Sequence, residues 1–312
     1  MFLKKSYKYP LMDPELGIVV GYNGSPGSMR ALRWGALTAQ KWAVPLTVCQ
    51  VWWWPHERQP GTTVPEKLSL GAAMRSLRQG AGHADGTAGH CHAQTLLLTG
   101  SPADELCTLT RKAHMVVVGS HGRRGWAGLP LGRVSTHLTA HADGPVIVLP
   151  PAARQACDSR AASVVVGTDG SPNSDPALGF GFAGADARRS PLHVVMSWAG
   201  LPSTFRRHRL ADVATAQDAA ESLLRSSLQR WQDRYPHVAV RASVTGQGPL
   251  VALLEAASAG ELLVVSSYLG ATEGGTDAGV VTRAILERAS CPVAVVPRSE
   301  GEWQTPWQSA AA

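Results

Sequence analysis

The hexapeptide Gly21-Tyr22-Asn23-Gly24-Ser25-Pro26 returns 146 residues later as Gly167-Thr168-Asp169-Gly170-Ser171-Pro172. A second pair of segments, Pro145-Val146-Ile147-Val148-Leu149-Pro150 and Pro292-Val293-Ala294-Val295-Val296-Pro297, is offset by 147 residues. Two kinds of segment that recur at nearly one spacing over so long a stretch indicate a duplicated domain. The sequence therefore predicts two copies of one fold in a single chain.

The size and composition of the chain agree with two globular domains. It has 312 residues, of which 44% are hydrophobic and 17% charged, as in ordinary globular proteins. Domains typically contain about 100–150 residues, so each half is long enough to bury a core of its own. We place the first domain at residues 1–150, a linker at 151–162 and the second domain at 163–312.

Charge, cysteine usage and hydropathy argue against several classes of protein. The net charge of +6 is not concentrated in a basic stripe, so nucleic acid is not expected as a partner. The five cysteines are odd in number and form no CxxC pair, which disfavours a disulfide framework. His83, His90, Cys91 and His92 match no common zinc spacing, so we expect no metal site. No apolar run reaches the roughly 18 residues of a membrane span, and a reducing cytoplasm is the expected location.

Short β-branched runs alternate with helical patterns in each half. Residues 17–21 are typical of a strand buried on both faces, and a helix is expected directly after it, with Ser25 as its cap and Pro26 in its first turn. Strands joined by helices predict a mostly parallel sheet covered on both faces. We therefore expect an α/β fold of two tandem open parallel-sheet domains. The other predicted strands are 45–52, 95–98, 115–118 and 146–149 in the first half and 164–166, 192–196, 238–244, 262–265 and 293–296 in the second, and predicted helices include 66–78, 133–142 and 214–231.

The glycine-rich segment from Gly119 to Ser135 is the strongest candidate for a binding site. In open α/β sheets the ligand lies beyond the carboxyl ends of the strands, and this segment follows the fourth predicted strand. Its glycines at positions 119, 122, 125, 128 and 132 allow backbone amides to approach an anion. Ser135 and the N-terminus of the next helix add a hydroxyl and oriented N–H groups. Because the segment has neither the GxxxxGK[ST] nor the GxGxxG pattern, it predicts a phosphate-binding loop of another kind.

The spacing Gly119-x2-Gly122-x9-Gly132 resembles the nucleotide-binding motif of the universal stress proteins. Residues 21–26, 100–103 and 141–146 also resemble that family in order and spacing, and two such domains resemble its tandem form. The resemblance implies Rossmann-like domains of the adenine nucleotide alpha hydrolase-like class. It also implies ATP as the ligand, alone or with Mg²⁺, and a role as a nucleotide-dependent regulator or sensor in a stress response.

The resemblance further implies where each part of the nucleotide binds. The end of the first strand meets adenine and ribose, the end of the second strand contacts adenine, and the glycine-rich loop holds the phosphates. Two positions depart from the family: Asn23 replaces the usual Asp but keeps an amide oxygen for a ribose hydroxyl, and Arg133 replaces the usual Ser or Thr. By position, the predicted site comprises Gly21 and Asn23 at the first strand, Val51 at the second, Gly119, Ser120, His121, Gly122 and Arg123 in the loop, and Gly132, Arg133, Val134 and Ser135 at the following helix.

The second half departs from the motif in a complementary way. Asp169 is retained, but Ser266 and Leu269 stand at the positions of Gly119 and Gly122. A leucine side chain at the second glycine obstructs a close approach of the backbone to phosphate. We therefore expect the first domain to hold most of the bound nucleotide and the second site to be weak or lost.

Two alternatives to a nucleotide-dependent regulator stay open. We identify no catalytic residue from spacing, so an enzyme is not expected beyond slow ATP hydrolysis, yet a slow nucleotide hydrolase would carry the same motif. A nucleotide-free interaction scaffold would instead explain Asn23 and Arg133 as signs of a lost site. The resemblance also implies an internal pseudo-dimer paired through strands 146–149 and 293–296. A homodimer of whole chains and an unidentified protein partner are both compatible with it.

Overall fold

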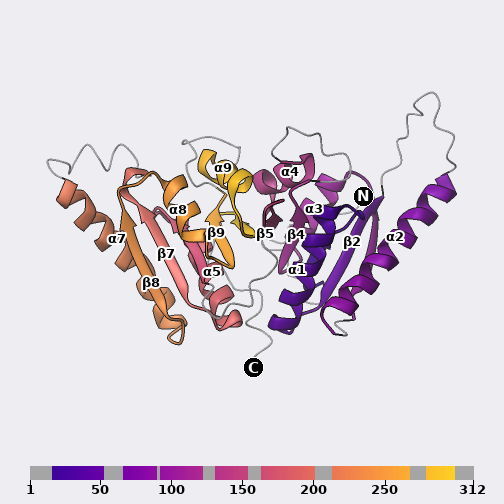
Figure 1. The fold of residues 1–312 in the computed structure, drawn as a ribbon, viewed down its shortest axis with the longest axis horizontal. Coiled ribbons are helices and arrows are strands. Elements are labelled where there is room, and N and C mark those ends of the chain that lie inside the picture. Colours follow the sequence, from indigo (N-terminus) through magenta and orange to yellow (C-terminus); the bar gives the residue numbers. More distant parts are fainter. Residues whose placement is uncertain are drawn as a thin grey trace, which may run out of the picture.

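The computed structural model describes residues 16–52, 66–89, 92–121, 131–153, 163–200, 213–267 and 279–298. We call the described residues up to 153 the first half and those from 163 onward the second half. Figure 1 shows the two halves side by side, the first on the right in indigo to magenta and the second on the left in salmon to yellow. Each half alternates strands with helices, as the sequence predicts.

The first half contains five strands and four helices within its described residues. These are β1 (Ile18–Gly21), α1 (Pro26–Trp42), β2 (Leu46–Trp52), α2 (Glu66–Thr87), β3 (Gln94–Thr99), α3 (Pro102–Thr110), β4 (Met115–Gly119), α4 (Arg133–His141) and β5 (Val146–Leu149).

The second half repeats this order. Its elements are β6 (Val164–Thr168), α5 (Asp175–Arg188), β7 (Leu192–Ser197), the 3-10 helix η1 (Trp198–Gly200), α7 (Val213–Arg234), β8 (Val240–Thr245), α8 (Pro249–Ala257), β9 (Leu262–Ser266), α9 (Val280–Arg288) and β10 (Val293–Val296).

All ten strands form one continuous sheet in the order β3-β2-β1-β4-β5-β10-β9-β6-β7-β8. Neighbouring strands within each half are parallel. The exception is the junction between the halves, where β5 and β10 run antiparallel with Ile147 opposite Ala294. The predicted pairing of the two halves through their final strands is therefore confirmed.

The sheet is covered on both faces because successive side chains of its strands point to opposite sides. Ile18 and Val20 of β1 pack into a cluster under α1, α2, α5 and α7, whereas Val19 packs into a cluster with α3, α4, α8 and α9. All three side chains are fully buried. Each cluster contains residues of both halves, so the core is continuous across the junction.

Helix α1 begins as its sequence predicts. Ser25 is the N-cap, and its hydroxyl accepts a hydrogen bond from the Ser28 N–H at 3.2 Å. Pro26 occupies the first helical position, where a missing N–H costs nothing. The residues of its inner face, Leu32, Ala36 and Ala39, are buried.

Helix α2 extends to Thr87, nine residues beyond the predicted end at Arg78. The prediction stopped where Gly80, Gly82 and Gly86 weaken helix propensity. Tertiary packing outweighs that low propensity, because here α2 packs closely on the buried Tyr22. A Cβ atom at Gly80 would lie 2.8 Å from the ring of Tyr22. A glycine is therefore required for this helix to pass over the end of β1.

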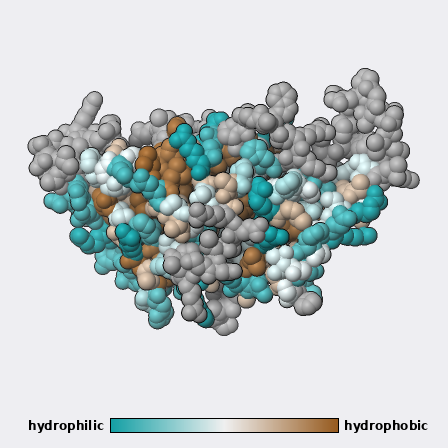
Figure 2. Space-filling model, in the orientation of Figure 1, coloured by the Kyte–Doolittle hydropathy of each residue, from teal (hydrophilic) through white to brown (hydrophobic). Residues whose placement is uncertain are grey.

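On the face drawn in Figure 2, an apolar area lies over α8, where Val251 is 49% exposed. A helix able to cross a membrane would need a long apolar stretch, and none within the described residues has one.

Candidate functional site

A cavity of about 390 Å³ opens at the carboxyl ends of β1, β2 and β4 in the first half. Its volume lies in the range of small-molecule sites. Every predicted site residue that the structure describes contributes to its lining, whereas Gly122 and Arg123 lie outside the described residues. The lining comprises Gly21, Tyr22, Asn23, Ser25, Ser28, Cys49, Val51, Pro102, Leu106, Val118, Gly119, Ser120, His121, Leu131, Gly132, Arg133, Val134 and Ser135.

Two facing glycines, Gly27 and Gly119, bring the first turn of α1 against the end of β4. A Cβ atom on Gly119 would lie 2.5 Å from the carbonyl carbon of Gly27, and one on Gly27 would lie 2.5 Å from the carbonyl oxygen of His121. Neither contact could be relieved by turning a side chain, because the neighbouring atoms are backbone. We call these residues the glycine pair. It places the N-terminus of α1 at the wall of the cavity.

The polar residues at the end of β1 form a compact network. The Asn23 side-chain oxygen accepts the Ser25 N–H at 3.0 Å, and the Ser28 hydroxyl donates to the Ser25 carbonyl at 2.9 Å. An amide oxygen can accept two hydrogen bonds. Asn23 therefore keeps one acceptor site for a ligand while it fixes the turn into α1.

At the opposite wall, internal hydrogen bonds hold both ends of the glycine-rich loop. The Gly132 N–H donates to the Ser120 carbonyl at 2.7 Å, and the Ser120 N–H donates to Leu149 of β5 at 3.0 Å. The buried Ser135 hydroxyl lies within hydrogen-bond distance of the Ser120 carbonyl (3.0 Å) and the Gly132 carbonyl (2.8 Å). The Ser135 hydroxyl therefore already donates its proton to a backbone carbonyl. An anion at this wall would have to be held by backbone N–H groups and by cations.

The charge pattern of the cavity suits an anion. Among the lining residues that the structure describes, none is Asp or Glu, while Arg133 and His121 supply basic groups. Arg133 is the first residue of α4, and Gly132, which has no side chain, occupies its N-cap. A cation next to the positive end of a helix dipole is unfavourable by itself. An anion bound between Arg133 and the helix end would remove that repulsion.

The thiol of Cys49 lines the cavity and is unreactive. Burial, and secondarily the charge of Glu105, raises the pKa of Cys49 to about 12. Because the thiolate is the reactive form, the neutral thiol acts here as an apolar contact. Burial also raises the pKa of Cys291, a residue of the core, to about 12. His90 and Cys91 lie outside the described residues, which contain no cluster of side chains suited to a metal ion.

The equivalent region of the second half is built differently. Asn173 and Ser266 stand at the positions of the glycine pair, and the Ser266 hydroxyl donates to the Asn173 carbonyl at 3.1 Å. Helix α5 begins only at Asp175, whereas the residue equivalent to the first of α1 is Pro172. Helix α5 therefore lacks about one turn at the place where the first turn of α1 meets the cavity in the first half. Leu269, Glu273 and Asp277, which also distinguish the second loop in the sequence, lie outside the described residues.

Sequence reasoning missed several residues that line the cavity or shape it. Tyr22 and Ser28 lie beside motif residues and could have been included on that ground. Cys49 pairs with Gly21 in the register of β1 and β2, and Leu106 comes from α3, so both required the tertiary structure. The role of Gly27 was likewise hidden, because its partner Gly119 is distant in sequence.

The model of the universal stress protein family matches residues 17–150 and 162–297. Universal stress protein Rv1996 of Mycobacterium tuberculosis is 34% identical over 301 residues, which cover 90% of this chain and 95% of that protein. Universal stress protein Rv2005c of the same organism is 32% identical over 297 residues, covering 91% and 97% of the two chains. Among solved structures, a universal stress protein from Archaeoglobus fulgidus DSM 4304 superposes with a TM-score of 0.67 at 16% identity and covers 91% of this chain and 98% of its own.

Proposed function

Because the chain belongs to the universal stress protein family, we propose that it binds an adenine nucleotide, ATP in the first instance, in the cavity of the first half. In this proposal the bound nucleotide makes the protein a regulator or sensor in a stress response. The observation that carries the proposal is the convergence of the predicted site residues on one cavity at the carboxyl edge of the sheet. These residues come from β1, β2, β4 and α4, which meet at the edge of the sheet where ligands bind in open α/β folds.

The lining residues fit the parts of an adenine nucleotide. Val51, together with Leu106 and Cys49, offers an apolar surface for a base. Asn23 offers the remaining acceptor site of its amide oxygen to a ribose hydroxyl. Arg133 offers positive charge, His121 offers a ring nitrogen for hydrogen bonding, and the N-terminus of α4 offers backbone N–H groups to phosphates.

The same lining favours slow turnover of a bound nucleotide. Since the described lining contains no carboxylate, a Mg²⁺ ion would have to be held mainly by the phosphates themselves. Efficient phosphoryl transfer needs a metal and a nucleophile held in fixed positions. We therefore propose a regulator in which any hydrolysis limits the lifetime of the bound state, in preference to a hydrolase with rapid turnover.

We further propose that the first half holds most of the nucleotide. In the second half, Asn173 and Ser266 replace the glycine pair, and the shortened start of α5 moves the helix end away from the position that α1 occupies. Asp169 keeps the expected geometry, because its carboxylate accepts the Ser171 N–H at 2.9 Å as Asn23 accepts that of Ser25. The Gly279 N–H also donates to the Ser267 carbonyl at 2.8 Å, as the Gly132 N–H donates to that of Ser120. One stoichiometric site per chain follows from this difference.

Calorimetric titration of ATP into the full chain, with and without Mg²⁺, tests the proposal. We expect one site per chain, and we expect Arg133→Glu to weaken binding about tenfold or more because it replaces a cation at the phosphates by an anion. The matched control is Arg283→Glu on α9, which makes the same change of charge on the corresponding helix of the second half. If the parent chain binds no ATP, and ATP does not raise its melting temperature, the protein is a nucleotide-free scaffold.

Restoring the family's acidic residue by Asn23→Asp is expected to strengthen ATP binding several-fold. A carboxylate accepts stronger hydrogen bonds than an amide, by roughly 1 kcal/mol. The turn itself should survive, because Asp169 forms the same bond in the second half. Titration with ATP and 2′,3′-dideoxy-ATP separates the ribose contact from a general charge effect: a gain that is equal for both ligands would contradict the assignment of Asn23 to a ribose hydroxyl.

A further inference from the structure

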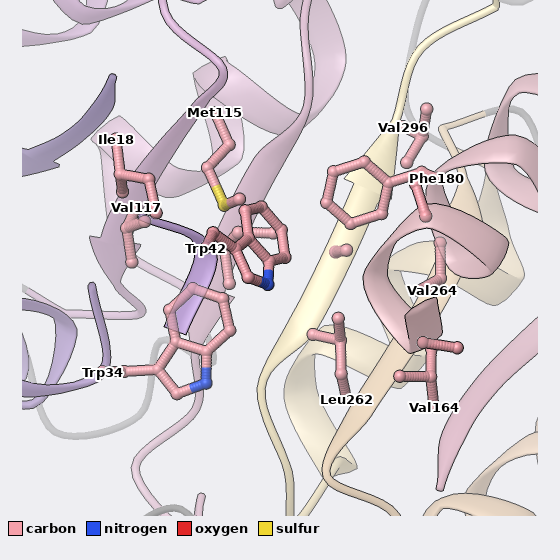
Figure 3. Close-up of a cluster of buried hydrophobic side chains, with 14 of the residues drawn as sticks. Ile18, Trp34, Trp42, Met115, Val117, Val164, Phe180, Leu262, Val264 and Val296 are labelled. Carbon is pink, nitrogen blue, oxygen red and sulfur yellow. The ribbon is translucent and has the colours of Figure 1, made fainter. Parts of the chain in front are cut away.

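The charged side chain of Arg188 is buried where the two halves meet. Arg188 is the last residue of α5, and its side chain is only 1% exposed. Its guanidinium lies over the rings of Trp34 and Trp42, which both belong to α1 of the first half, at 5.4 and 5.0 Å from their centroids. Figure 3 shows the two tryptophans directed from α1 toward the second half, with Trp42 facing Phe180 of α5. The cation thus lies against two aromatic rings of the other half.

The guanidinium of Arg188 has few other contacts, and the two halves contribute different kinds of group to them. Glu261 of the second half lies 3.4 Å from the Arg188 Nε, and Lys41 of the first half lies 3.5 Å from the same carboxylate. The Arg188 Nη2 donates to the Thr38 hydroxyl of the first half at 3.5 Å. Among the described residues, the Arg188 Nη1 has no hydrogen-bond partner. Glu261 therefore supplies the compensating charge from the same half, and the first half adds two aromatic rings and one hydrogen bond.

The residues of this cluster occupy equivalent positions in the two halves but differ in chemistry. Ala43 and Arg189 are the left-handed caps that end α1 and α5, so Trp42 and Arg188, the residues before them, are equivalent. By the same alignment Trp34 corresponds to Phe180. His114 and Glu261 correspond as well, because each lies directly before the strand that follows the third helix of its half.

Because of these differences, the stability of the junction depends on which two halves pair. Two second halves paired in the same way would bring two buried Arg188 side chains together and would offer Phe180 in place of Trp34. Each Arg188 would keep its own Glu261, but neither would have the tryptophan rings, and two buried cations side by side repel each other. Two first halves would place Trp42 against Trp42, with no cation to stack on either ring. Only unlike halves bring the cation and its aromatic partners together.

We propose that Arg188, stacked on Trp34 and Trp42, makes the antiparallel β5–β10 junction selective for a first half facing a second half. The selected partner is defined by chemistry: an α1 face with two tryptophans, facing an α5 face with a buried arginine. The backbone pairing of β5 with β10 carries no such preference, because both strands present short apolar side chains. The selectivity therefore resides in the helices beside the junction.

Substitutions in the intact chain can imitate each like-half junction. Arg188→Trp with Glu261→His gives the second half the residues of the first, and Trp42→Arg with His114→Glu gives the first half those of the second. We expect each double variant to lower the melting temperature by roughly 5–10 °C, and we expect the variant with two arginines to lose more. All four substitutions together put one arginine and one tryptophan back across the junction, with Phe180 in place of Trp34, and should restore at least half of the melting temperature that the two double variants lose together.

The control is Arg230→Trp, at an exposed position of α7 away from the junction. It removes a cation that stacks at 4.8 Å on Trp231 and pairs with Asp175. We expect this control to change the melting temperature by less than about 2 °C. The proposal is overturned if a like-half variant is as stable as the parent, or if the quadruple variant loses the sum of the two double variants. Should a double variant fail to fold, the quadruple variant still decides, because a folded quadruple variant supports the selectivity and an unfolded one contradicts it.

Discussion

Replacing Gly119 by alanine is expected to lower the free energy of unfolding by about 2–4 kcal/mol and to abolish ATP binding. The added Cβ would lie 2.5 Å from the backbone of Gly27, so α1 must shift away from β4. Overpacking of a rigid contact typically costs about 1–3 kcal/mol, and here the obstructing atoms belong to the backbone at the start of a helix. The shift would also displace Asn23 and Ser28 at the cavity wall. Urea denaturation and calorimetric titration measure the two effects.

Gly86→Ala is the matched control for this change. Gly86 lies in α2 and an added Cβ would meet nothing within 4 Å. Because alanine is the better helix former, this variant is expected to be neutral or more stable by up to about 1 kcal/mol. If Gly119→Ala left the urea midpoint and the affinity for ATP unchanged, the close approach of α1 to β4 would not be what shapes the cavity.

The architecture could be predicted from the sequence because it depends on local patterns. Runs such as Ile18–Gly21 and Val146–Leu149 are short, apolar and β-branched, and such runs indicate strands buried on both faces. The repeat then transfers each assignment from one half to the other. The joining of the halves through β5 and β10 came from the family resemblance, because no local pattern distinguishes a junction strand from any other buried strand.

Features that depend on tertiary contacts could not be predicted in the same way. The glycines of α2 suggest an early end to that helix, but Gly80 is needed for packing on Tyr22. The late start of α5 was also hidden, because Ser171-Pro172 repeats the sequence that begins α1. The one local signal is Pro176 in the first turn of α5, where α1 has Arg30: a proline is not tolerated in a helix interior, so it favours a start near Asp175.

The candidate site was predicted by position, and its chemistry was not. The motif correctly selects the loops that form the cavity, since loops at the carboxyl ends of neighbouring strands converge. It does not show that the Ser135 hydroxyl is engaged by the carbonyls of Ser120 and Gly132, or that Asn23 is already half occupied. These bonds depend on side-chain orientation, which spacing alone does not determine.

Removing the carboxylate of Glu261 is expected to destabilise the fold strongly and to leave the affinity for ATP almost unchanged. Glu261→Ala leaves the buried Arg188 without its anionic partner, and breaking one side of a buried ion pair typically costs about 3–5 kcal/mol. The Lys41 contact across the junction is lost in the same step. Since the cavity lies at the other end of α1, affinity for ATP should stay within about twofold of the parent wherever the variant is folded. Chemical denaturation gives the loss of stability, and calorimetric titration gives the affinity.

Glu287→Ala provides the comparison, because Glu287 pairs with Arg283 on the exposed face of α9 at 3.7 Å. Exposed pairs one helical turn apart contribute about 0.3–0.5 kcal/mol, so this variant should be almost as stable as the parent. Glu261→Gln separates charge from packing: it keeps the size of the side chain, and it should lose nearly as much stability as Glu261→Ala if the uncompensated cation is the cause. If Glu261→Gln matched the parent instead, the aromatic faces of Trp34 and Trp42 would alone be sufficient to hold the buried Arg188.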